Sequence, residues 1–226
     1  MKVSDRTTNL LKNYAIINQS IEFREGKLLK TVSPLNTILA SVEIEEEFPR
    51  AVPLYNLNEF LGILSTYDDP ELEFNDNSVK IVEKNDNEEY TEYRYCASSS
   101  MFQTPPEKEI SFPTPEINFT LTNNVWKKVV DRTNVLGLPE IVVEGDGATI
   151  RIRTYDTGNS SSNLNSKKVG VTDKTFRMIF KTENLIKVME GDYDVSLSSK
   201  RISHFKREGD SLQYWIALEQ NSTFEE

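Results

Sequence analysis

The first half of the chain contains the stretch Leu57-Asn58-Glu59-Phe60-Leu61-Gly62-Ile63-Leu64-Ser65. Its apolar residues recur every three or four positions, which predicts a short helix over residues 57–66 with one buried side. Residues 182–189 have the same character in the second half, and Gly191 is expected to end that helix. Aligning the two stretches places Phe60-Leu61 on Leu185-Ile186. This match indicates that one structural unit occurs twice in the chain.

The residues around these two helices follow one order in both halves. The first half shows a helical pattern at residues 4–17 and extended patterns at 21–23, 28–29, 38–44, 72–74, 79–82 and 90–95. The second half shows a helix capped by Thr122 and extended patterns at 141–143, 150–152, 176–180, 195–197, 202–205 and 212–218. Each half thus reads helix, three strands, helix, three strands. The pattern predicts an α+β protein made of two similar domains, each with antiparallel sheets and two helices.

Four of the nine prolines lie between the halves, at positions 105, 106, 113 and 115. Proline fixes its own φ and has no N–H for a sheet ladder, so this stretch is expected to be an extended connector. A chain of 226 residues has room for one to two domains. We therefore predict an N-terminal domain over residues 1–104, a connector over 105–117 and a C-terminal domain over 118–226.

Composition excludes several classes of protein. The 26 Lys and Arg residues stand against 36 Asp and Glu, a net charge of −10, so the chain should not bind nucleic acid indiscriminately. Cys96 is the single cysteine and His204 the single histidine, which argues against a disulfide framework and a Cys- or His-rich metal centre. The sequence has no apolar run of signal-peptide or membrane-spanning length. We expect a soluble, intracellular protein that does not bind a membrane.

The sequence carries no legible catalytic constellation or phosphate-binding loop. Gly145-Asp146-Gly147 lies between two predicted strands and is expected to be a hairpin turn. His204 has no nucleophile or carboxylate in a readable relation to it, which favours a structural or surface role. We therefore predict that the chain is not an enzyme and uses no metal or cofactor.

The positive charge of the predicted helices is the more informative feature. Lys12 lies roughly opposite the apolar face of the first helix, and Lys127 and Lys128 lie away from the Val125/Val129 stripe of the third. Lys187 opposes the apolar residues of the fourth helix. Arg6 and Arg132 lie nearer the margins of their helices. These helices are close to neutral while the rest of the chain is strongly acidic, although polar helix faces in water would also explain the pattern.

Four segments resemble the sliding clamp of T-even-type bacteriophages, the DNA polymerase processivity factor. They are Met1-Lys2-Val3-Ser4 through Thr7-Thr8-Asn9-Leu10-Leu11-Lys12-Asn13, the stretch Leu57 to Ser65 with its mid-helix Gly62, the connector residues 106–113, and residues 217–223. Residues 139–175 diverge and match by pattern alone. The resemblance implies the DNA clamp fold and three subunits that close a ring around double-stranded DNA without reading its sequence.

The resemblance further implies where such a protein works and with what. The expected partners are a DNA polymerase, an ATP-driven clamp loader, other copies of the chain in a homotrimer and late-transcription factors. The expected location is the cytoplasm of the infected bacterial host. The residues expected to face DNA are Arg6, Lys12, Lys127, Lys128, Arg132 and Lys187.

A ring also needs exposed strand edges and a site for partner tails. We expect the subunit interface in residues 93–101 and 169–176, with Tyr93, Tyr95, Met101, Val169, Val171 and Phe176 as its members. We expect a partner-peptide pocket near the connector, formed by Ile110, Phe112, Trp215 and Ala217. Ordinary packing would also explain the aromatic members of both sets. The competing hypothesis for the whole chain is a structural β-rich virion or assembly protein with no role at DNA.

Overall fold

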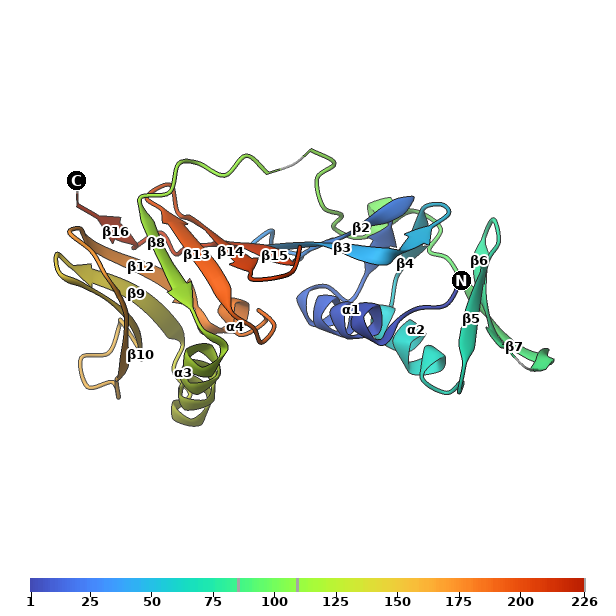
Figure 1. Cartoon of the computed structure of the whole chain (residues 1–226), viewed down its shortest axis with the longest axis horizontal. Helices are drawn as coiled ribbons and strands as arrows, with labels where there is room; N and C mark the ends of the chain where they lie inside the picture. Colours follow the sequence, from blue (N-terminus) through green and yellow to red (C-terminus); the bar gives the residue numbers. More distant parts are fainter. Residues whose placement is uncertain (85, 109, 226) are drawn as a thin grey trace. The chain divides into compact units, whose positions relative to one another are not determined.

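The computed structural model describes residues 1–84, 86–108 and 110–225, and the backbone alone of residues 86–88. The chain divides into two compact units, Met1–Glu107 and Lys108–Glu226. The division falls inside the predicted connector. Each unit combines antiparallel sheets with two helices (Figure 1).

Unit 1 contains two helices that pack against short antiparallel sheets. Its elements are α1 (Asp5–Ile17), β1 (Ile21–Phe23), β2 (Gly26–Val32), β3 (Ile38–Phe48), β4 (Val52–Leu54), α2 (Leu57–Leu64), β5 (Pro70–Phe74), β6 (Ser78–Glu83), β7 (Asp86–Arg94) and the 3₁₀ turn η1 (Ser99–Met101). Strand β1 pairs with β4, β2 pairs with β3, and β5, β6 and β7 form a three-stranded sheet with β7 at its edge.

Unit 2 repeats this order with a strand added at each end. Its elements are β8 (Ile117–Leu121), α3 (Asn123–Leu136), β9 (Glu140–Asp146), β10 (Thr149–Tyr155), β11 (Asn165–Val171), β12 (Thr175–Lys181), α4 (Thr182–Leu185), β13 (Tyr193–Ser198), β14 (Ile202–Arg207), β15 (Gln213–Ala217) and β16 (Thr223–Phe224). One sheet has the order β11-β10-β9-β12-β16, so β11 lies at its edge. Strands β8, β13, β14 and β15 are neighbours in the other.

Equivalent backbone hydrogen bonds tie the two units to one plan. The Leu57 N–H donates to the Gln19 carbonyl at 2.7 Å, and the Thr182 N–H donates to the Pro139 carbonyl at 2.9 Å. Each bond joins the start of the second helix to the residues that follow the first. Likewise Cys96 donates to Pro53 at 2.9 Å and Glu219 to Ile179 at 2.8 Å. The expected fold class, two similar α+β units, is therefore confirmed.

Two details of the predicted order are wrong. In the described residues, four strands rather than three separate the helices of each unit, because β4 and the start of β11 were not expected as strands. The fourth helix was expected over residues 182–189, but α4 ends at Leu185. The chain then tightens into three-residue turns, in which Lys187 and Val188 donate to Asn184 and Leu185. The apolar spacing in this stretch reflects a buried turn and not a longer helix.

Local sequence fixes where the helices begin. Ser4 caps α1 by accepting the Thr7 N–H, and Asn56 caps α2 by accepting the Glu59 N–H, each at 3.2 Å. Thr122 makes no such bond at α3, and the Asp192 carboxylate accepts the Asn123 N–H at 2.6 Å instead. Residues that follow α4 thereby complete the start of α3.

Candidate nucleic-acid interface and partner sites

Helix α1 presents the two expected cations of unit 1 to solvent. Lys12 is exposed, while Leu10, Leu11 and Tyr14 are buried beneath the helix. The structure offers Lys12 no ion-pair partner among the residues that it describes. Arg6 is also exposed, and its guanidinium donates to the Glu43 carbonyl at 3.3 Å. This bond holds Arg6 along β3, so Lys12 has the freer charge of the two.

Helix α3 carries three of the expected cations on its exposed side. Trp126, Val129 and Thr133 are buried, whereas Lys127, Lys128 and Arg132 are exposed. Lys128 and Arg132 are four residues apart and so share one side of the helix. Arg132 donates to the Asn165 amide oxygen at 3.1 Å. The helical phase expected from the sequence therefore agrees with the positions of these side chains.

Lys187 lies in the turn after α4 and not on a helix. This turn is joined to α3 by an ion pair between Lys127 and Glu190 at 3.7 Å and by a bond from the Trp126 ring N–H to the Val188 carbonyl at 3.5 Å. The turn that contains Lys187 therefore packs beside α3. Glu190 offsets the charge of Lys127.

The two expected interface segments overlap strands at the edges of sheets only at their first residues, 93–94 on β7 and 169–171 on β11. Strand β7 is an edge of the three-stranded sheet, and β11 is an edge of the five-stranded sheet. On β11, Val171 is 74% exposed and Val169 is half-buried. An edge strand presents backbone N–H and C=O groups to a further strand. Both edge strands can therefore accept another strand, unlike the interior strands beside them.

The tyrosine side chains at the end of β7 pack within unit 1 and are not exposed along the edge of the sheet. The Tyr93 ring packs edge-on against Phe60 at 5.5 Å, and its hydroxyl donates to the Asn56 carbonyl at 3.1 Å. Burial, assisted by Glu59, raises the pKa of Tyr93 to about 12. Tyr95 is half-buried and burial also raises its pKa, while Met101 is exposed on η1 beside the Cys96 sulfur. Only Met101 of these three side chains is strongly exposed.

The prediction that Phe176 lies at a sheet edge is wrong. Phe176 is on β12, between β9 and β16, and is only 3% exposed. A Cβ atom at Gly145, its partner on β9, would lie 2.4 Å from the Phe176 ring. The ring therefore fills the space above a glycine in the core of the sheet. Glycine is required at position 145 for this packing.

Two of the four expected partner-peptide residues, Phe112 and Trp215, lie next to His204. The His204 ring stacks on the Trp215 ring, with centroids 5.0 Å apart and an interplanar angle of 15°. The Phe112 ring is the second neighbour of His204, with centroids 5.5 Å apart. Gln213 shares a hydrogen bond of 2.9 Å with His204 Nε2, and burial lowers the pKa of His204. Ala217 lies two residues beyond Trp215 on the same side of β15, and Ile110 is half-buried on the connector.

Sequence reasoning did not connect His204 with Phe112 and Trp215. The signal was the cross-strand pairing of His204 with Trp215, which depends on the register of β14 against β15. The Trp215 ring N–H is buried and has no hydrogen-bond partner in the part of the chain that the structure describes. This stack, Phe112–His204–Trp215, fixes the connector to the sheet of unit 2. We call it the connector stack.

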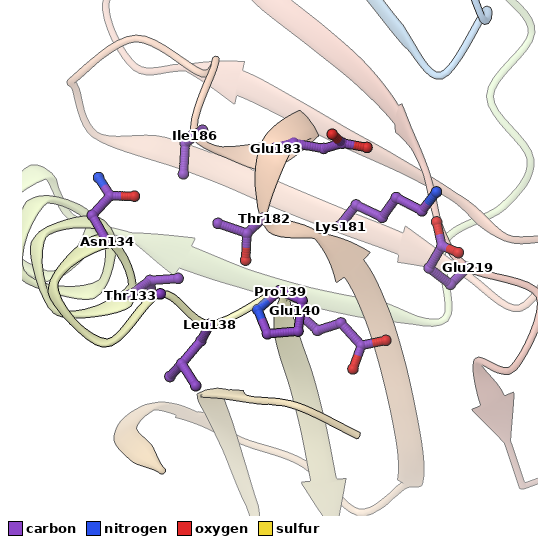
Figure 2. A pocket seen from close by; sticks show the side chains of 11 residues that line it. Thr133, Asn134, Leu138, Pro139, Glu140, Lys181, Thr182, Glu183, Ile186 and Glu219 are labelled. Carbon is purple, nitrogen blue, oxygen red and sulfur yellow. The ribbon is translucent and has the colours of Figure 1, made fainter. Parts of the chain in front are cut away.

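A separate pocket of about 500 Å³ lies between the end of α3 and the start of α4 (Figure 2). Thr133 and Leu138 line it from the α3 side, and Thr182 and Ile186 from the α4 side. Charged side chains form its rim: Glu140, Lys181, Glu183 and Glu219. The pocket includes none of the residues expected from the sequence to bind a partner.

Two features of the described residues bear on other classes of function. Among the described residues, no group of three or more His, Cys, Asp or Glu side chains has the arrangement of a metal site. In the same part of the chain, no helix is both long enough and apolar enough to cross a membrane.

Comparison with known proteins gives a consistent match at the level of sequence. Residues 2–102 match the family model described as DNA polymerase processivity factor. The chain is 31% identical to the sliding clamp of Vibrio phage KVP40 over 97% of its own length and 99% of that protein. It is 28% identical to the sliding clamp of Enterobacteria phage T4 over 99% of both chains.

The fold has more distant relatives among solved structures. The Helicobacter pylori beta clamp, solved bound to a DNA ligase peptide, matches with a TM-score of 0.71 at 13% identity. That match covers 97% of this chain and 65% of the beta clamp chain. At this identity the likeness concerns the fold alone.

Proposed function

Because the chain belongs to the sliding clamp family of phage DNA polymerase processivity factors, we propose that it forms a homotrimeric ring that encircles duplex DNA. The chain has the DNA clamp fold and is a DNA sliding clamp. The match to a phage sliding clamp along nearly the whole chain is the observation that carries this conclusion. The ring would hold the replicative DNA polymerase on its template for processive synthesis.

The two free sheet edges support a head-to-tail ring. By sequence, β7 contains Asp86, Glu88, Glu89 and Glu92, whereas β11 contains Lys167 and Lys168. Opposite charge favours pairing of β7 of one subunit with β11 of the next over pairing of two identical edges. A contact between unlike surfaces builds a ring when its rotation closes. Three copies would close the ring and cover both edges.

The exposed cations of α1 and α3 support contact with DNA inside such a ring. Lys12, Lys128 and Arg132 would face phosphates without reading bases, as binding independent of sequence requires. Each contact is screened over about 8 Å at physiological salt and contributes little on its own. Weak, dispersed contacts let a ring slide, while the net charge of −10 keeps DNA from adhering to other surfaces.

The connector stack supports a site for partner tails in unit 2. Phe112 and Trp215 are half-buried apolar side chains of the kind that anchor an extended peptide. The beta clamp of H. pylori binds a DNA ligase peptide. In our proposal, tails of the polymerase and of an ATP-driven clamp loader bind here. A Phe112→Ala variant that stays trimeric yet binds a polymerase tail normally would remove the connector from the site.

We further propose that the chain catalyses no reaction and acts in the cytoplasm of an infected bacterium. Opening of the ring would be the work of the ATP-driven loader, and late-transcription factors would use the ring as a mobile platform. The alternative, a structural virion protein, is not favoured, because the matches in sequence and fold are to clamps.

Native mass spectrometry at micromolar concentration tests the ring. We expect a trimer of the 25.9 kDa chain. Proline at the exposed position Val171 should weaken it, because proline cannot donate to a strand on that edge. A monomer that persists at high concentration would contradict the ring, and an unchanged trimer of a well-folded Val171→Pro variant would exclude β11 as the contact.

A further inference from the structure

The outer face of the five-stranded sheet in unit 2 carries three arginines around one glutamate. In the register of the sheet, Arg151 and Arg177 lie on either side of Glu144, and Arg153 is two residues from Arg151 on the same face. The opposite face carries buried residues such as Ile150 and Ile152. We call the hollow at these four charged residues the arginine pocket. It encloses about 260 Å³.

Glu144 is fully engaged by two of the three arginines. Its carboxylate lies 3.2 Å from Arg153 Nη1 and 3.7 Å from Arg177 Nε. The Tyr155 hydroxyl donates to Glu144 at 2.6 Å and accepts from Arg177 Nε at 3.1 Å. Burial and then this bond to Glu144 raise the pKa of Tyr155. Glu144 is itself only 20% exposed, so its capacity to accept further donors is limited.

One guanidinium group keeps accessible donors beside this network. Arg153 Nε has no hydrogen-bond partner among the described residues, but it is buried by protein atoms and closed to a ligand. Within the described residues, the Arg151 guanidinium has neither an ion pair nor a hydrogen bond. Glu144 is taken up by Arg153 and Arg177. The Arg151 guanidinium therefore keeps its donors for a further anionic group.

Other carboxylates near the pocket lie toward its hairpin end. Asp146 accepts the Ala148 and Thr149 N–H groups at 3.0 and 2.7 Å, and these bonds lower its pKa. Glu225 also lines the pocket. The part of the pocket that carries the arginines is therefore small, and it suits the carboxylate of an acidic side chain better than a long polyanion.

We propose that the arginine pocket binds a carboxylate of an acidic peptide segment from a partner protein. The carboxylate would accept from the Arg151 guanidinium, in the planar geometry that guanidinium and carboxylate groups share. Duplex DNA fits less well, because Asp146 and Glu225 would oppose its neighbouring phosphates.

This site is separate from the surfaces already assigned. Arg151 lies on β10 and pairs with Lys168 of β11, so the pocket begins one strand spacing, about 4.8 Å, inside the β11 edge. A strand added to that edge would lie beyond β11 and leave the face of β10 open. The connector stack lies on β14, β15 and the connector and shares no residue with the arginine pocket. The proposal thus adds a second partner site to the proposed sliding clamp.

Fluorescence anisotropy with a labelled peptide tests the assignment. The probe is Gly-Glu-Asp-Glu-Asp-Gly, and the control peptide carries Gln and Asn in place of Glu and Asp. We expect the intact protein to bind the acidic peptide and Arg151→Ala to weaken it about tenfold. Lys200→Ala removes the same charge from an exposed turn of unit 2 and should leave binding unchanged. Glu144→Gln should strengthen binding, because it releases Arg153 and Arg177.

The mass of the trimer and the melting temperature are measured for each variant. Only variants that match the intact protein in both are compared, so that a folding defect is not mistaken for lost binding. Equal binding of the acidic and amide peptides, or equal affinity of Arg151→Ala and Lys200→Ala, would overturn the proposal. Arg151-dependent binding of a short DNA duplex in preference to the peptide would assign the pocket to phosphate instead. Trimer formation and loading on DNA should not change in Arg151→Ala, so failure here leaves the clamp function intact.

Discussion

The two units share one order of elements but differ at their free edges. Edge strand β7 of unit 1 is rich in Glu, and edge strand β11 of unit 2 carries Lys167 and Lys168. These strands also hold different places in the repeat, since β7 corresponds to β15 and β11 to β3. A duplicated fold has thus acquired two complementary ends. In the proposed ring, this difference lets one chain pair with copies of itself in one direction only.

The sheet of unit 2 depends on a close contact that unit 1 lacks. Gly145 lies under the Phe176 ring, whereas the corresponding residue of unit 1, Glu25, is exposed. We expect Gly145→Ala to lower the free energy of unfolding by about 3 kcal/mol, because the added Cβ overlaps both the ring and the Lys174 carbonyl. Urea denaturation measures this change.

Gly158→Ala is the matched control, since its Cβ would meet only the Asp156 carboxylate at 3.4 Å. It should change the free energy of unfolding little. Equal stability of the two variants would show that the packing of Phe176 on Gly145 does not hold the sheet of unit 2 together.

Reversing the charge of β11 tests the complementary edges. Lys167→Glu with Lys168→Glu places acid against the acidic β7 of the next subunit, so the trimer should dissociate about tenfold more readily. Adding Glu89→Lys and Glu92→Lys should restore it. Analytical ultracentrifugation measures the dissociation. Lys200→Glu with Lys206→Glu makes the same change in charge away from both edges and should leave the trimer as it was.

The helices differ as the edges do, because α2 carries no cation while α3 carries three. Reversing Lys127 and Lys128 to glutamate should slow loading on DNA and processive synthesis several-fold while the trimer persists, since both side chains lie outside the core. The effect should grow as salt is lowered. Loading and synthesis at the parental rate across a salt series would mean that α3 does not face DNA.

Only unit 2 has a histidine, and its titration gives the smallest effect. Burial lowers the pKa of His204 below that of the unfolded chain, so protonation favours unfolding. Its contribution to stability is complete above the unfolded pKa near 6.5 and is lost as pH falls through the lower folded value. His204→Phe should flatten the dependence of stability on pH between 7.5 and 5.5. An unchanged slope would place the sensitivity elsewhere.

Much of this architecture was predictable from periodicity. The apolar spacing of α1, α2 and α3 placed their buried and exposed sides, and the prolines at 105–115 placed the connector. The start of β11 was missed because Asn165, Ser166, Lys167 and Lys168 lack strand-like alternation, and pairing with β10 makes them a strand. The end of α4 and the burial of Phe176 depend on contacts between distant residues, which spacing does not reveal.

The candidate sites were less predictable than the fold. The positions of the apolar residues along each helix predicted which cations are exposed, because this prediction depends only on residues within one helix. The connector stack and the arginine pocket require the registers of β14 with β15 and of β9 with β10. A one-residue slip in either register would separate these side chains. Such sites become visible only in three dimensions.

Retention on circular DNA tests the central claim, that this chain encloses DNA as a ring. The protein is loaded on a nicked circle by its clamp loader, freed of unbound protein by gel filtration, and followed before and after one restriction cut. We predict that it stays with the circle through a high-salt wash and leaves once the cut creates ends. Equal loss from circular and linear DNA after verified loading would contradict a topological link.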